Sequence, residues 1–174
     1  MLYRKDNHDG FTLIETLIYI AVIGGMAISF ITFSLSITGS RNKTYVAQEV
    51  QANSRFALNI ISRTIKTAIG INTSTSVFNL DPGVLSLSMA SSSLNPTIIS
   101  LDQNDGILSV KKGTDDPINI TSNKIQVTNL VFSNFTTSGS SNIGIDLTIA
   151  YKNTSNDVYY NYAQDIQTAV SFRK

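Results

Sequence analysis

The amino-acid sequence predicts an α+β protein in which one long N-terminal helix packs on an antiparallel β-sheet. Three observations support this prediction. The 25 residues from Thr16 to Ser40 contain no charged side chain. An amphipathic pattern of helical period follows them up to about residue 70. From residue 71 onwards, serine, threonine and asparagine become frequent and β-branched residues alternate with polar ones, as in strands with one buried face.

The first element is the apolar segment 11–40, which is long enough to cross a bilayer as a helix of about 20 residues. A secretory signal peptide has a shorter apolar core, of about 7–15 residues, followed by a small-residue cleavage site that is not found cleanly here. A plain membrane anchor explains the length but gives no role to Glu15, a carboxylate near the start of the segment. Because a charge inside a membrane is costly, such an acid is by default a functional residue that needs a partner.

The second element, residues 41–70, continues the helix beyond the apolar segment. Arg63 and Lys66 suit the negative end of a helix dipole, and Gly70 predicts the end of the helix. We therefore expect one helix from about Thr12 to Ile69, whose second half packs an apolar stripe on another layer. The stripe recurs at spacings of 3, 4 and 7 and consists of Val46, Val50, Ala57, Ile60, Ile61, Ile65, Ala68 and Ile69.

The third element, residues 71–174, contains the predicted strands. Alternating patterns predict strands near residues 85–89, 97–101, 107–111, 124–135, 143–152 and 166–172. The segment 102–106 ends in Asp-Gly, which predicts a hairpin turn. The alternation slips near Asn129, which predicts a β-bulge. We expect these strands to form one sheet, whose apolar face is covered by the stripe of the helix.

The string Gly10-Phe11-Thr12-Leu13-Ile14-Glu15 resembles the cleavage site of the type IV prepilin and pseudopilin family. The strong resemblance is confined to residues 1–40. It implies that a prepilin peptidase removes the leader 1–10 on the cytoplasmic side, between Gly10 and Phe11. Phe11 would then become the N-methylated N-terminus, and the apolar segment would remain in the mature protein.

The leader agrees with this resemblance only in part. Arg4 and Lys5 are the positive charges expected of a segment that is retained in the cytoplasm. Asp6 and Asp9 add an acidity that departs from the pattern.

The resemblance also implies a role for Glu15 in assembly. Cleavage creates an α-amino group on Phe11, about one helical turn from the carboxylate. An amine and a carboxylate attract strongly in a medium of low dielectric. In this family the glutamate pairs with the N-terminal amine of a neighbouring subunit, which sets the register between subunits.

The predicted architecture is also that of type IV pilin-like proteins. In addition, residues 51–65 resemble the helix end of J-type minor pseudopilins, which cap the pseudopilus of type II secretion. The resemblance implies a structural subunit, a minor pilin or pseudopilin, of a type IV pilus, a competence pilus or a type II secretion pseudopilus. Its partners would be other subunits, the prepilin peptidase and the bacterial inner membrane, with the N-terminus cytoplasmic and the C-terminal domain extracytoplasmic.

Three alternatives remain open. A non-polymerising, membrane-anchored extracytoplasmic binding domain would not be cleaved at Gly10. A major pilin would be abundant in sheared filaments. A DNA-capturing minor pilin would need a basic stripe, although the net charge of +1 argues against nucleic acid. The cations available for such a stripe are Lys111, Lys112, Lys124 and Lys152, with Arg173 and Lys174 at the C-terminus.

The composition argues against an enzyme. The chain has no cysteine, and its single histidine, His8, lies in the leader. Nucleophilic sites that use His or Cys, and zinc sites built on them, are therefore not expected. Asp115 and Asp116 precede Pro117 and predict a turn. We expect no catalytic residues, no cofactor and no small-molecule substrate.

Asp102 and Asp105 are the candidate calcium ligands, because oxygen ligands suit that ion. The EF-hand spacing is absent, and a hairpin turn explains every residue of this loop. We therefore expect no metal site. The alternative is a calcium site that uses Asp102 and Asp105.

Overall fold

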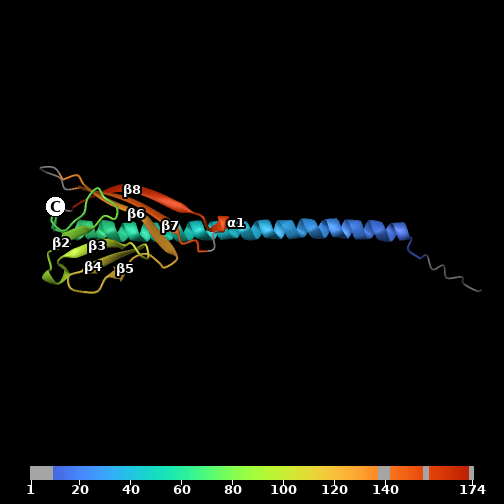
Figure 1. Ribbon diagram of the computed structural model, residues 1–174, viewed down its shortest axis with the longest axis horizontal. Coiled ribbons are helices and arrows are strands. Elements are labelled where there is room, and N and C mark those ends of the chain that lie inside the picture. The colour runs from blue at the N-terminus through green and yellow to red at the C-terminus, as the bar shows by residue number, and fades with distance from the viewer. Residues whose placement is uncertain (1–9, 137–141, 155–156, 173–174) are drawn as a thin grey trace, which may run out of the picture. The chain divides into compact units, whose positions relative to one another are not determined.

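The computed structural model describes residues 10–136, 142–154 and 157–172. Within them, one α-helix precedes eight strands and two short 3-10 helices (Figure 1). The prediction of an α+β fold is thereby confirmed. Residues 1–9 of the predicted leader lie outside the described residues. The chain divides into two compact units, Met1–Arg41 and Asn42–Lys174.

Helix α1 spans Leu13–Thr67 and is continuous over 55 residues. Thr12 caps its start, where the backbone N–H of Glu15 donates to Thr12 Oγ1 over 3.3 Å. The helix ends two residues before the predicted Ile69. The backbone N–H of Ile69 donates instead to the carbonyl of Ser88 over 2.9 Å, so pairing with a strand ends the helix.

The first sheet has five strands in the order β1-β2-β3-β4-β5, and all neighbouring pairs are antiparallel. Its strands are β1 Gly70–Ile71, β2 Leu85–Ser88, β3 Thr97–Asp102, β4 Ile107–Lys112 and β5 Ile118–Asn119, with the 3-10 helix η1 at Ser92–Leu94. The predicted β3–β4 hairpin is confirmed, and Gly106 adopts the positive φ of 67° that its turn requires. Gly70, predicted to follow the helix, is already part of β1.

The second sheet has three strands in the order β6-β7-β8. Its strands are β6 Ile125–Asn134, β7 Asn142–Tyr151 and β8 Ala163–Ser171, with the 3-10 helix η2 at Val158–Tyr160. The register between β6 and β7 shifts between Val127 and Asn129, so the predicted bulge is confirmed. The bulge increases the local twist of β6.

The prediction of one sheet was wrong, because loops occupy the second edge of β6. Asn79 donates its backbone N–H to the carbonyl of Phe132 over 2.8 Å, and Gly83 donates to the carbonyl of Leu130 over 2.6 Å. Further along, the backbone N–H of Val127 donates to the carbonyl of Gly106 over 2.8 Å. The loop before β2 and the β3–β4 turn thus satisfy an edge on which a strand of the first sheet would otherwise pair.

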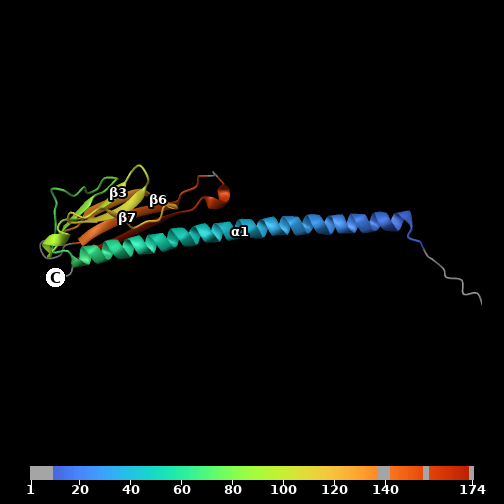
Figure 2. The same ribbon diagram turned by 90° about the horizontal axis from the view of Figure 1, so that it is seen from below.

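Both sheets share a core with the C-terminal part of α1, and the strands lie along this part of the helix in both views (Figures 1 and 2). The buried residues of this part of the helix are Val46, Val50, Ser54, Ala57, Ile61 and Ile65, and Ala68, directly after the helix, is also buried. The predicted stripe is therefore largely correct. Ile60 is only partly buried. Ile69 is 69% exposed, because the helix ends before it.

Candidate functional site

The peptide bond predicted to be cleaved lies directly before α1. Gly10, Phe11 and Thr12 are not helical, and the helix begins at Leu13. The side chain of Phe11 is 73% exposed. A non-helical, exposed bond is the form of backbone that a peptidase can take into an extended cleft.

Glu15 occupies the third helical position after its capping residue, Thr12. The spacing Thr-x-x-Glu is that of a capping box, in which the Thr side chain binds the N–H of the Glu. A carboxylate in this first turn also interacts favourably with the positive end of the helix dipole. Glu15 is therefore stabilised locally by the start of its own helix.

Tyr19 brings the two predicted site residues together. Its hydroxyl donates to Glu15 Oε1 over 3.3 Å, and its ring meets the ring of Phe11 edge to face with centroids 6.1 Å apart. Sequence reasoning did not single out Tyr19. The spacing of four residues from Glu15, which places both on one helix face, was the available signal.

The residues around this group are apolar and exposed. Of the described helices, α1 contains a window long and apolar enough to cross a membrane, and none of that window is buried inside the protein. Its large exposed side chains include Leu17, Ile18, Ile20, Val22, Ile23 and Met26. Such a surface favours contact with lipid or with other apolar helices.

The loop with the calcium candidates is a hydrogen-bonded turn. Asp102 Oδ1 accepts the backbone N–H of Asn104 over 2.9 Å, and the Asp102 carbonyl accepts the N–H of Gly106 over 2.8 Å. Asp102 and Asp105 are both exposed. No group of three or more His, Cys, Asp or Glu side chains comes together in the part of the chain that the structure describes.

The cations considered for DNA do not share one environment. Lys124 directly precedes β6 and Lys152 directly follows β7, and the backbone N–H of Lys152 donates to the Lys124 carbonyl over 2.8 Å. Lys111 and Lys112 end β4 in the first sheet. Arg173 and Lys174 lie outside the described residues.

Lys124 belongs to a tyrosine cluster that the sequence patterns did not reveal. Lys124 Nζ donates to Tyr45 Oη over 2.7 Å, and this hydrogen bond raises the pKa of the lysine. The ring of Tyr45 meets Tyr151 edge to face at 6.5 Å, and Tyr151 stacks on Tyr160 at 5.8 Å. Burial raises the pKa of Tyr151. The cluster joins α1 to the end of β7 and to η2.

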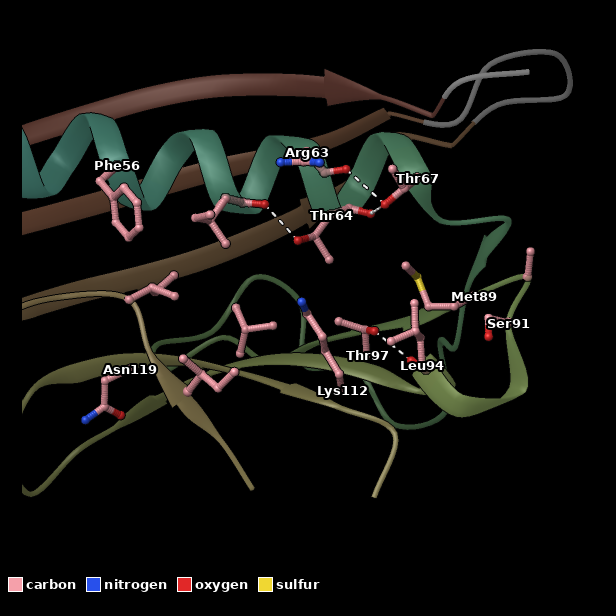
Figure 3. A pocket seen from close by; sticks show the side chains of 15 residues that line it. Phe56, Arg63, Thr64, Thr67, Met89, Ser91, Leu94, Thr97, Lys112 and Asn119 are labelled. Atoms are coloured by element: carbon pink, nitrogen blue, oxygen red, sulfur yellow. Dashed lines mark hydrogen bonds between the residues drawn. The ribbon is translucent and has the colours of Figure 1, made fainter. Parts of the chain in front are cut away.

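A groove of about 640 Å³ lies between the last turns of α1 and the first sheet (Figure 3). Phe56, Ile60 and Arg63 contribute from α1, and β4 and β5 form the opposite wall. The segment that follows β2 closes one end. Sequence reasoning missed this groove. The available signal was Phe56, a large aromatic residue of the helix that lies outside the apolar stripe.

Comparisons of this chain with protein-family models, with curated proteins and with solved structures give no match.

Proposed function

We propose that the chain is a minor pilin or pseudopilin with a type IV pilin-like fold. It assembles through its N-terminal helix into a type IV pilus, a competence pilus or a type II secretion pseudopilus. One observation supports this best. The string from Gly10 to Glu15 coincides with the start of a continuous 55-residue helix, so that the scissile bond is non-helical and the acid lies in the first turn.

The proposed assembly follows from the charges at this helix start. Removal of residues 1–10 leaves a positive amine on Phe11, next to a carboxylate on Glu15. In the free subunit, Tyr19 is the hydrogen-bond donor to that carboxylate. In the filament, the amine of a neighbouring subunit takes over as a stronger, charged partner. The apolar surface of α1 packs against the helices of other subunits.

This proposal places the chain in the bacterial inner membrane before assembly. The N-terminus lies in the cytoplasm and the residues after the apolar segment lie outside it. The helix is then the membrane anchor of the free subunit and the assembly element of the filament.

Mass spectrometry of the purified protein tests the proposal. The chain is expressed in bacteria with and without a prepilin peptidase. We expect a mature N-terminus at Phe11, carrying one methyl group, in the peptidase-containing strain only. Gly10→Val should block cleavage, whereas Gly24→Val, a matched change within α1, should not. An intact Met1 in both strains would contradict the proposal and favour a membrane-anchored binding domain.

A further inference from the structure

The groove between α1 and the first sheet presents large apolar side chains that the protein's own core does not use. Phe56 on α1 is 55% exposed and Ile118 on β5 is 60% exposed, although both line the groove. Met89 and Leu94 add apolar surface at its end. Exposed aromatic and aliphatic side chains beside a recess are typical of a docking site, because a partner can bury them.

The charged residues that line the groove are both cations. Arg63 lies on α1 and Lys112 on β4, and none of the lining residues is acidic. Lys112 extends from its strand into the space below α1 (Figure 3). The resulting positive charge complements a ligand that carries carboxylates.

The strand β5 adds an open backbone edge to the groove. Ile120 donates its N–H to the carbonyl of Leu108 over 2.8 Å, which marks a hydrogen-bonded pair. Such pairs alternate with non-bonded ones along an antiparallel ladder. Ile118, opposite Val110, is therefore bonded to β4. The N–H and C=O of Asn119 point away from β4, and β5 is the last strand of its sheet among the described residues.

We propose that this groove binds an extended segment of a partner protein that presents apolar side chains and carboxylates on the same side. Successive side chains of an extended peptide point to opposite sides. Ile118 lies opposite Val110, and Lys112 lies two residues further along β4, so Ile118 and Lys112 are on the same face of the first sheet. The side chains of the peptide on this face would contact Phe56 and Ile118 through apolar groups and approach Arg63 and Lys112 through carboxylates. The peptide backbone would pair with Asn119 as an added strand. A lipid-like anion would fit the apolar recess and the cations but would leave this backbone edge unused. The proposal does not depend on cleavage or assembly at the N-terminal helix.

Fluorescence anisotropy of labelled peptides tests this proposal. The full-length chain is placed in nanodiscs of zwitterionic phospholipid, with empty nanodiscs as the control for partition into lipid. The probes are two hexapeptides with serine at every second position, so that the other three side chains share one face. In one peptide these three positions hold valine and glutamate, and in the other they hold valine and lysine. We expect saturable binding of the glutamate peptide that weakens with added salt, and no saturable binding of the lysine peptide. Equal binding of the two peptides would overturn the proposal.

Two pairs of variants locate the binding. Lys112→Glu should weaken binding of the glutamate peptide at least about tenfold, the size of one lost charged contact. Lys111→Glu, the neighbouring residue that does not line the groove, should leave it within about twofold. Asn119→Pro removes the outward N–H at an edge where proline is tolerated and should weaken binding, whereas Asn119→Ser should not.

The variants also separate a peptide from a lipid-like ligand. Unchanged binding in Lys112→Glu would overturn the proposal. Displacement of the peptide by dodecanoate, combined with unchanged binding in Asn119→Pro, would also overturn it and would assign the groove to lipid-like anions.

Discussion

Tyr19 lies one turn after Glu15 on α1, and its hydroxyl donates a hydrogen bond to Oε1 of Glu15 over 3.3 Å. The same ring contacts Phe11, the residue that becomes the N-terminus if the predicted cleavage occurs. An acid within an apolar segment therefore has a neutral partner in its own chain. A neutral donor compensates a carboxylate less than a charged amine does. Under the proposed function, the carboxylate would therefore still gain from pairing with the amine of a neighbouring subunit.

This relationship leads to a prediction about assembly. Glu15→Ala should reduce incorporation into filaments more than about tenfold, because it leaves the neighbour's buried amine unpaired, which costs about 3–5 kcal/mol. Tyr19→Phe should retain incorporation within about twofold, since the amine replaces the hydroxyl in the filament. The measurement is the amount of each variant in sheared filaments, normalised to its amount in the membrane. Equal incorporation of Glu15→Ala and the wild type would contradict the assembly role.

A second prediction concerns the bulge in β6. Asp81 Oδ1 accepts the backbone N–H of Leu130 over 2.9 Å, directly after the register shift at Val127 and Asn129. Asp81→Ala should lower the free energy of unfolding by about 1–3 kcal/mol, because this N–H loses its acceptor. Asp81→Asn retains an acceptor oxygen, so its free energy of unfolding should fall by less than half as much as that of Asp81→Ala. Chemical unfolding of the full-length chain in detergent, followed by circular dichroism, measures both changes, and equal losses would contradict the assignment.

A third prediction concerns Ser54, which is fully buried on α1 and whose Oγ has no hydrogen-bond partner among the described residues. Ser54→Ala should raise the free energy of unfolding by about 1 kcal/mol, because it removes an unsatisfied buried hydroxyl and introduces a better helix former. Ala57→Ser, at an equally buried site one turn away, should lower it by a similar amount. A drop in stability for Ser54→Ala would show that its hydroxyl has a partner, such as a buried water.

A fourth prediction concerns alkaline pH. The folded-state pKa values of Lys124 and Tyr151 are both raised above their ordinary values of 10.5 and 10.0. The folded protein then retains protons that the unfolded chain releases, so stability is complete below a pH of about 10 and falls as the pH rises further. Thermal unfolding midpoints at several pH values should show this decline.

Tyr45→Phe tests the cause of the raised lysine pKa. It removes the hydroxyl that accepts the hydrogen bond from Lys124, so the decline above a pH of about 10 should become shallower. Tyr159→Phe is the control, because Tyr159 contacts Lys43 through its ring and not Lys124. A decline of the same steepness in Tyr45→Phe would show that the hydrogen bond does not set the lysine pKa.

The sequence alone was sufficient for the elements whose cause is local. The apolar segment and the helical period that follows it predicted α1 to within two residues of its observed ends. In the second half, burial of one stripe enforces that period. The Asp-Gly pair predicted the β3–β4 hairpin, since its turn needs a residue at positive φ. The string from Gly10 to Glu15 placed the candidate cleavage site directly before the helix and the acid in its first turn.

Tertiary structure alone decided what depends on contacts between distant residues. The split into two sheets follows from backbone bonds that the loop at Asn79 and Gly83 makes to β6, about 50 residues further along the chain. The groove exists because folding places β4 and β5 opposite the C-terminal part of α1, so that Lys112 and Ile118 line the same recess as Phe56, to which no local pattern connects them. The periodicity of a sequence predicts which side chains are buried. It does not predict which backbone edges and which exposed side chains lie close together in the folded protein.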